Sequence, residues 1–270
     1  MDYNALPPHL IESITGELSD EEIAGIVLGG SYARGEATPF SDIDFAPFLR
    51  EGAAPRKKQL FYRGGYLVSI SYKTVAGVVS DMKLPNRAIW VVNGFKGARV
   101  LLDRDGSITG LLRKIEAFAW EPLQRAANDY AGASLAGSAE AVHKLLGELY
   151  VGDDLALSLA TANLLTNLTD LVAVQRGVLV KSDRTYYRQV QESVGTESAW
   201  TQYHNVVTGV TQGPLDAQST PPRLRALAVL ALYKQTVALV EPFVAPSHRE
   251  TALQAIRALR EALLPKIYEQ

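Results

Sequence analysis

The spacing of apolar residues changes near residue 110, and this change divides the chain of 270 residues into two parts. Before it, short runs of β-branched and aromatic residues alternate with glycine-rich turns, a pattern typical of a β-sheet. After it, apolar residues recur at intervals of three and four, which is the spacing of one helix face. The clearest series is Leu157, Ala160, Leu164, Leu168 and Leu171. At roughly 150 residues per domain, the length allows one large domain or two modest ones.

We therefore expect an α+β protein of two domains. Residues 1–108 are predicted to form a small mixed β-sheet domain with flanking helices, and residues 109–270 an all-α helical bundle. The predicted strands are Ile23–Leu28, Ile43–Leu49, Tyr66–Tyr72, Ile89–Val92 and Arg99–Leu102. The predicted helices of the second part begin with Ile108–Glu116, Pro122–Tyr130 and Ala139–Tyr150.

The amino-acid composition excludes several classes of protein. Hydrophobic residues make up 47% and charged residues 21% of the chain, ordinary values for a globular protein that exclude a disordered or coiled-coil chain. The balance of 27 Lys and Arg against 29 Asp and Glu gives a net charge of −2, whereas proteins that coat a nucleic-acid backbone normally carry a basic excess. Without cysteine, the chain has no disulfides, thiolate nucleophiles or cysteine-based zinc sites.

The N-terminal residues show neither the basic region nor the apolar run of a secretory signal. A membrane span takes about 20 consecutive apolar residues, and the segments Leu155–Val174 and Leu224–Val244 come closest to that. Asp170 interrupts the first segment and Lys234 the second, so we interpret both as buried helices. The expected location is the cytoplasm, with no membrane partner.

A glycine-rich turn follows the first predicted strand. The strand ends at Leu28 and gives way to Gly29, Gly30 and Ser31, after which a helical turn can begin. Glycines let backbone amides approach a ligand closely, and amides at the start of a helix donate to anions. Ser31 adds a hydroxyl group, and Arg34 adds a positive charge nearby. This pattern predicts a phosphate-binding turn.

Two aspartates follow about ten residues later, at Asp42 and Asp44. Side chains at i and i+2 of a strand point to the same face, about 6.6 Å apart at Cα. The two carboxylates therefore project together, while Ile43 and Phe45 point into the core. Such a pair is costly without a cation, and its hard oxygen atoms suit Mg²⁺, which commonly binds one or two carboxylates plus substrate phosphates. The sequence thus predicts a site for magnesium and a nucleoside triphosphate.

The loop after the second predicted strand has a local basic excess. Its cations are Arg50, Arg56, Lys57, Lys58 and Arg63. They either attract an anionic ligand or form an ordinary solvated loop.

Gly30-Ser31, followed by Asp42-Ile43-Asp44, resembles the signature of the DNA polymerase β-type nucleotidyltransferase superfamily. The layout of a small mixed-sheet domain followed by a helical substrate-binding domain is similar to the aminoglycoside and lincosamide nucleotidyltransferases. The resemblance implies transfer of a nucleoside monophosphate from a triphosphate to a hydroxyl group, with Asp42 and Asp44 as catalytic, Mg²⁺-binding residues. It implies AMP from ATP as the transferred group and a small, antibiotic-like molecule as the acceptor.

This chain departs from the superfamily at one point. Members usually carry a third carboxylate on a later strand, whereas the corresponding strand here offers Ser69 or Ser71. A serine hydroxyl is neither an anionic metal ligand nor a general base at neutral pH. Three explanations stay open: the helical half supplies the base, a single Mg²⁺ suffices, or the domain binds nucleotide without turnover.

The carboxylates that could supply a base from the helical half are Glu140, Glu148, Asp153, Asp154 and Asp170. Among these, Glu140 and Glu148 are our candidates. Lys181, after the long central helix, is a candidate phosphate contact, as a basic residue there is in related transferases. The predicted function is Mg²⁺-dependent transfer of a nucleotidyl group to a small molecule. The alternatives are a regulatory nucleotide-binding protein and a transferase that modifies a protein or an RNA end.

Overall fold

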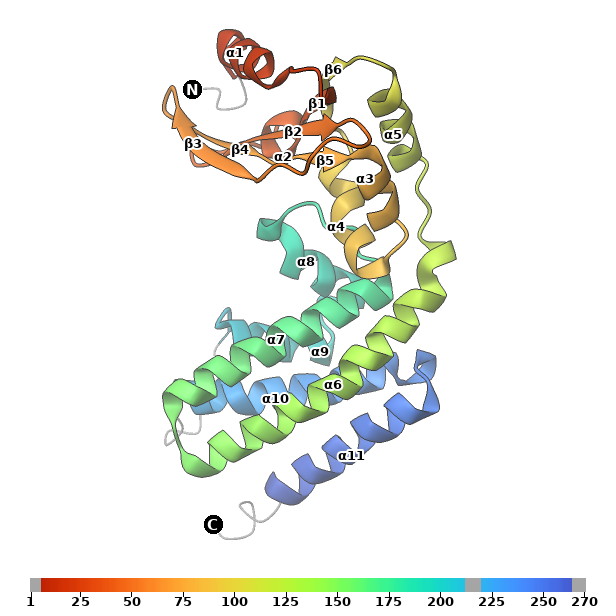
Figure 1. Ribbon diagram of the computed structural model, residues 1–270. Helices are drawn as coiled ribbons and strands as arrows, with labels where there is room; N and C mark the ends of the chain where they lie inside the picture. Colours follow the sequence, from red (N-terminus) through yellow and green to blue (C-terminus); the bar gives the residue numbers. More distant parts are fainter. Residues whose placement is uncertain (1–5, 212–219, 264–270) are drawn as a thin grey trace. The chain divides into compact units, whose positions relative to one another are not determined.

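A computed structural model describes residues 6–211 and 220–263 of the protein (Figure 1). The described chain forms two compact units. The first contains residues 6–121 together with the short segment 179–183, and the second contains 122–178 and the described residues from 184 onward. The division differs from the predicted one at residue 108, since the helix at Ser107–Glu116 belongs to the first unit. The mixed-sheet and all-helical parts of the predicted fold are both present.

The first unit is built on a mixed sheet with the strand order β3-β4-β2-β1-β6, and β5 pairs with β2. Its strands are β1 (Ile23–Leu28), β2 (Ile43–Leu49), β3 (Gln59–Arg63), β4 (Tyr66–Ile70), β5 (Lys73–Thr74) and β6 (Arg99–Asp103). The β2 strand runs parallel to β4 and β5, and the other pairs are antiparallel. This arrangement puts β2 at the centre of the sheet, with a neighbouring strand on each side.

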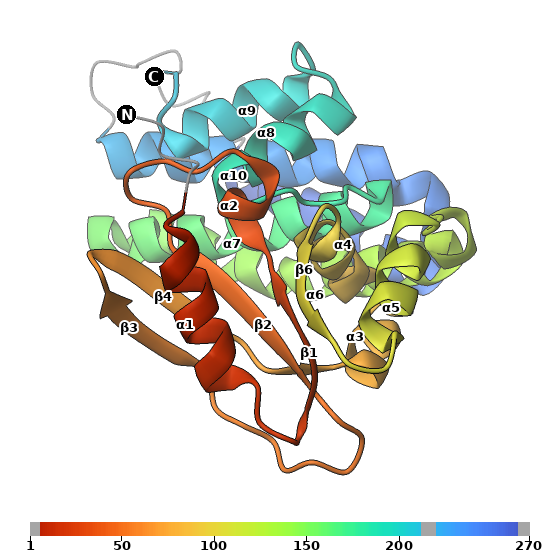
Figure 2. The same ribbon diagram turned by 90° about the horizontal axis from the view of Figure 1, so that it is seen from above.

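Helices cover both faces of this sheet (Figure 2). On one face, α1 (Pro8–Leu18) packs its buried residues against Ile43 and Phe45 of β2. On the other, α3 (Val75–Asp81), α4 (Pro85–Phe95) and α5 (Ser107–Glu116) enclose Phe48. Because side chains alternate along a strand, Asp44 shares the second face with Phe48.

Two of the predictions are wrong, and one strand was not predicted. The predicted strand Ile89–Val92 lies inside α4, which begins with Pro85 and buries residues at helical spacing. The strand β3 was not predicted because it is a largely exposed edge strand within the basic segment. The helices predicted at Pro122–Tyr130 and Ala139–Tyr150 form one continuous helix, α6 (Gln124–Val151).

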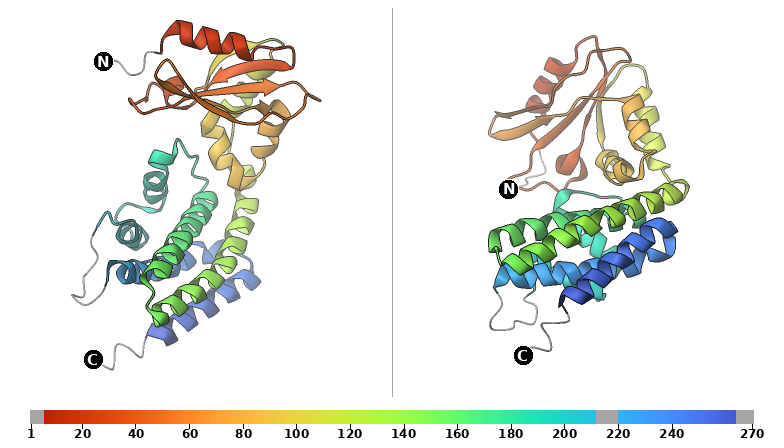
Figure 3. Two further views of the ribbon diagram at one scale, coloured as in Figure 1. Left: turned by 60° about the vertical axis from the view of Figure 1, so that its left-hand side comes forward. Right: turned by 60° about the horizontal axis from the view of Figure 1, so that its bottom comes forward.

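The second unit is all helical. Its helices are α6, α7 (Asp154–Arg176), α8 (Asp183–Val194), α9 (Ala199–Thr208), α10 (Pro221–Val240) and α11 (Pro246–Leu263). The helices α6, α7, α10 and α11 lie side by side (Figure 3). Both α7 and the segment Pro221–Phe243 are long and apolar enough to cross a membrane, but half or more of their most apolar stretches is buried within the unit.

A buried histidine joins α7, α8 and α9. The ring of His204 is fully buried and stacks on Trp200 at 4.9 Å between centroids. Its Nδ1 lies 3.0 Å from the side-chain amide nitrogen of Gln191, and its Nε2 lies 3.2 Å from the hydroxyl of Thr169. An amide donor facing Nδ1 favours the neutral ring protonated at Nε2. Burial lowers the pKa of His204 to about 4.

This histidine predicts a loss of stability in mild acid. Between pH 7 and pH 5 the unfolded His204, with an ordinary pKa of about 6.5, gains a proton that the folded form does not accept. The free energy of unfolding should therefore fall by about 2 kcal/mol over this range from His204 alone. Urea unfolding at both pH values measures the loss. The change should be smaller in His204→Gln and unchanged in His143→Gln, which replaces an exposed histidine; an equal loss in all three proteins would refute the assignment.

Candidate functional site

The predicted phosphate-binding turn lies where β1 ends. Gly29 donates its backbone N–H to the carbonyl of Asp44 at 2.9 Å, which ties the turn to β2. The short helix α2 (Gly30–Arg34) begins at once and contains Ser31 and Arg34. The turn predicted from the glycine pattern is therefore placed directly beside the strand that carries the predicted carboxylates.

Gly30 lies so close to the Asp44 carboxylate that a side chain at position 30 would require Asp44 or the turn to move. A Cβ atom added to Gly30 would lie 2.2 Å from the Oδ2 atom of Asp44. Gly30 also has φ of +65°, a backbone conformation that residues with a side chain rarely adopt. The turn and the carboxylate thus form one site within the first unit.

The negative charge of Asp42 acts on Asp44. Asp42 directly precedes β2, and Asp44 is its second residue. Burial, followed by the negative charge of Asp42, raises the pKa of Asp44 to about 6. A hydrogen bond from the Ser69 hydroxyl and the positive charges of Lys58 and Arg34 act in the opposite direction. The protein's own cations therefore do not fully compensate the pair of carboxylates.

Ser69 lies beside Asp44. The two residues are directly paired between the parallel strands β2 and β4, and Ser69 is buried. The other candidate, Ser71, follows the end of β4 and donates its backbone N–H to Phe45. Among the described residues, no group of three or more His, Cys, Asp or Glu side chains could hold a metal ion. At the position where the resemblance implies a third carboxylate, a serine hydroxyl donates a hydrogen bond to Asp44.

These residues fit a Mg²⁺ ion. The donor set consists of two hard carboxylates, and the raised pKa of Asp44 shows that the site disfavours two negative charges when no cation is bound. Asp42 and Asp44 would hold the ion, and substrate phosphates and water would complete its shell. When bound, the ion would neutralise charge on the phosphates and on the transferred phosphoryl group.

The basic residues divide into two groups. Arg56 forms ion pairs with Asp20 and Glu22, and Arg63 forms one with Glu17. In contrast, Lys58 exerts its charge on Asp44, as does Arg34, although Arg34 also pairs with Glu36 at 3.0 Å. Lys58 is the site residue for which the sequence offered the weakest signal, because only the local basic excess pointed to it.

The candidate bases of the helical half lie on α6 of the second unit. Glu140 is exposed and pairs with Lys144 at 2.7 Å, and the hydrogen bond from Lys144 lowers the pKa of Glu140. A lowered pKa makes a carboxylate a weaker base. Glu148 is partly buried near the end of the same helix.

The other acidic residues of the helical half have local structural contacts. Asp153 caps α7 by accepting the backbone N–H groups of the next turn. Asp170 accepts a hydrogen bond from the hydroxyl of Tyr186, and Asp154 accepts one from Thr220. Since Glu140 is also paired, these contacts do not assign the base, and Glu140 and Glu148 stay candidates.

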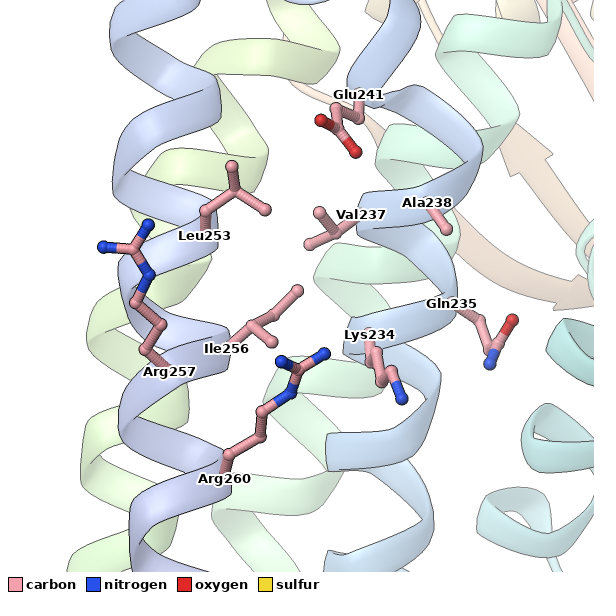
Figure 4. A pocket seen from close by; sticks show the side chains of 9 residues that line it. All are labelled: Lys234, Gln235, Val237, Ala238, Glu241, Leu253, Ile256, Arg257 and Arg260. Carbon is pink, nitrogen blue, oxygen red and sulfur yellow. The ribbon is translucent and has the colours of Figure 1, made fainter.

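Lys181 lies in the segment 179–183, which belongs to the first unit although it links two helices of the second. It thus shares a compact unit with Gly30, Asp42 and Asp44. A shallow groove in the second unit, of about 230 Å³, runs between α10 and α11 (Figure 4). Its walls carry Lys234, Glu241 and Arg260 among others, and it contains none of the predicted site residues.

Comparison with known proteins finds a similarity for part of the first unit. Residues 11–84, which include the turn, both aspartates and Ser69, match the protein family described as Nucleotidyltransferase domain. A crystal structure of a nucleotidyltransferase-like protein from Exiguobacterium sibiricum 255-15 is similar, with a TM-score of 0.50 and 14% sequence identity over 87% of this chain and 77% of that chain. At this identity the likeness concerns the fold. No curated protein sequence matches. Residues 11–84 of the first unit are therefore similar to a nucleotidyltransferase domain.

Proposed function

We propose that the protein transfers a nucleotidyl group, AMP from ATP, to a hydroxyl group of a small molecule in a Mg²⁺-dependent reaction. The observation that carries this proposal is the close approach of Gly30 to Asp44, which unites a phosphate-binding turn with a pair of acidic metal ligands. The nucleotidyltransferase match over residues 11–84 supports the reaction class. The small acceptor rests on the resemblance of the two-part layout to the aminoglycoside and lincosamide nucleotidyltransferases.

In the proposed reaction, the acceptor oxygen forms a bond to the α-phosphorus, and the bond from that phosphorus to the bridging oxygen breaks. Pyrophosphate leaves, and the hydroxyl proton passes to a base. The backbone amides of Gly30 and Ser31, the Ser31 hydroxyl and Arg34 hold phosphate oxygens, while Ser69 fixes the orientation of Asp44 by its hydrogen bond. Glu140 and Glu148 are the proposed candidates for the base.

The test is direct. The protein is incubated with Mg²⁺ and each labelled nucleoside triphosphate against a panel of hydroxyl-bearing small molecules, and pyrophosphate release is measured. Release that needs both Mg²⁺ and an acceptor supports the proposal, and the triphosphate that reacts identifies the donor. Release only with a protein or RNA acceptor would replace the small molecule by a macromolecule.

A second candidate function rests on Ser69. Because a serine stands beside Asp44 and the described residues lack a third carboxylate nearby, a domain that binds nucleotide without transfer fits the same site. Nucleotide binding without pyrophosphate release on any acceptor would favour this regulatory function.

Ser69 also yields a prediction about metal binding. Since Ser69 is paired with Asp44, Ser69→Asp adds a carboxylate next to the proposed ligands and should leave the Mg²⁺ affinity unchanged or raise it severalfold. The metal-free variant should unfold more easily, because the carboxylate added at this buried position is repelled by Asp42 and Asp44. Calorimetric Mg²⁺ titration compares it with Ser69→Asn, which is similar in size and uncharged. A loss of affinity specific to Ser69→Asp would place Ser69 outside the site.

A further inference from the structure

The segment between α7 and α8 departs from the helical unit and packs on α4 of the first unit. Residues 179–183 belong to the first unit, and the link lies beside α4 in Figures 1 and 2. We name residues 179–183 the strap. The strap therefore brings a lysine from the second half of the sequence, Lys181, into the unit that holds the nucleotidyltransferase site.

Two short hydrogen bonds hold the strap in place just before Lys181. The side-chain amide of Asn93 donates to the carbonyl of Leu179 at 2.6 Å. The backbone N–H of Val180 donates to the carbonyl of Ile89 at 2.6 Å. Ile89 and Asn93 are four residues apart on α4, so both partners lie on the same side of that helix.

Burial reinforces these bonds. Leu179 packs against the core formed by α3, α4 and α5, and Val180 is almost completely buried. Lys181, directly after them, is exposed. The chain is thus held in place up to Val180, and the next residue, Lys181, is at the surface. Of the two hydrogen bonds described above, the one from Asn93 is made by a side chain and the other joins two backbone groups.

The same helix touches the phosphate-binding turn. A Cβ atom added to Gly29 would lie 3.7 Å from the carbonyl oxygen of Gly94, the residue after Asn93. The last turn of α4 therefore contacts the turn with Gly94 and the strap with Asn93. Because α4 contacts both the strap and the phosphate-binding turn, it fixes the distance between them.

We infer that Asn93 is a positioning residue: it fixes the strap on α4 so that Lys181 meets the phosphate groups of the nucleotide. The inference rests on the proposed function, since it needs a triphosphate in the Gly30 turn. A lysine acts on phosphate as a point charge, and its contribution depends on where its backbone is held. Asn93 neither contacts the nucleotide nor takes part in proton transfer, and it acts only through Lys181.

A double-mutant cycle tests the inference. The probe is inorganic tripolyphosphate with Mg²⁺, titrated calorimetrically, because it carries the phosphates without a base. Lys181→Ala should weaken binding about 10-fold, the scale of one hydrogen bond to a charged group. Asn93→Ala should weaken it about 3- to 10-fold in the wild-type background and have no further effect in Lys181→Ala.

Controls separate positioning from loss of structure. Asn93→Leu keeps the approximate side-chain size and removes the donor without adding a charge, so either folded Asn93 variant completes the cycle. Asn86→Ala, an exposed asparagine on the same helix, should leave binding unchanged. A merely structural role for Asn93 would weaken binding to the same degree whether or not Lys181 is present.

The outcomes also distinguish this inference from the proposed function. If wild-type protein does not bind the probe, or binds it equally well after Asp42→Asn with Asp44→Asn, the proposed site itself is wrong. If binding depends on the aspartates but Lys181→Ala has no effect, or the Asn93 and Lys181 effects simply add, only the inference is overturned.

Discussion

Replacing Asp42 and Asp44 together by asparagine is expected to abolish Mg²⁺-dependent nucleotide binding while the first unit stays folded. Both carboxylates project from the start of β2, and the pair is the acidic donor set of the proposed site. Loss of one preorganised charge-stabilising group typically costs on the order of 10²–10³-fold in rate, so nucleotidyl transfer should fall by at least about 10³-fold. Calorimetry with a non-hydrolysable ATP analogue and Mg²⁺ measures the binding. Unchanged affinity in the double variant would refute the site.

Replacing Asp44 alone is expected to stabilise the metal-free protein, although it removes a proposed metal ligand. The pKa of Asp44 is raised to about 6 from an ordinary value of 3.8, so the folded, metal-free protein holds the protonated form more tightly than the unfolded chain does. This contribution to stability is complete below about pH 4 and is lost as the pH rises through 6. Asp44→Asn should therefore raise the free energy of unfolding of metal-free protein by about 1–3 kcal/mol at pH 7.5, with no gain at pH 4.

Urea unfolding in the presence of a chelator measures this gain. Asp129→Asn, which neutralises an exposed aspartate of α6, is the matched control and should change little. A lower free energy of unfolding for Asp44→Asn than for the wild-type protein at pH 7.5 would contradict this prediction. It would mean that the charged Asp44 carboxylate stabilises the fold.

Gly30→Ala is expected to have the second-largest effect. The added methyl group would overlap the Oδ2 atom of Asp44, with only 2.2 Å between them, and the backbone at φ +65° disfavours a side chain. The Asp44 carboxylate or the turn must move. We expect at least about a 100-fold loss of Mg²⁺-nucleotide affinity, since displacement of a site by about 1 Å already costs on that order.

Gly35 provides the matched control. It has a similar φ of +70°, but no atom outside its immediate neighbours lies within 4 Å of an added Cβ. Gly35→Ala therefore carries the same backbone strain, about 1–2 kcal/mol, without the overlap. It should lower stability and leave nucleotide affinity near the wild-type value. Equal affinities of the two variants would mean that the close approach of Gly30 to Asp44 has no functional consequence.

Local patterns sufficed for the central elements of the site. The strands β1 and β2 begin and end at the predicted residues, because each combines strand-forming composition with a clear boundary: the glycines after Leu28 and the polar residues before Ile43. The predicted strand at Ile89–Val92 failed because four β-branched and apolar residues look alike in a strand and on a buried helix face. Only the packing of α4 against the sheet distinguishes the two.

Local patterns along the chain predict the order of the site elements: a glycine turn, then two carboxylates on a strand, then a helical second half. These features depend on residues close together in the chain, whose geometry follows from backbone preferences. Which distant residues lie beside these elements depends on how the chain packs. Sheet pairing placed Ser69 against Asp44, and the packing of the strap on α4 carried Lys181 into the first unit. Such contacts depend on how buried surfaces fit together across the chain, and no spacing along the sequence encodes that fit.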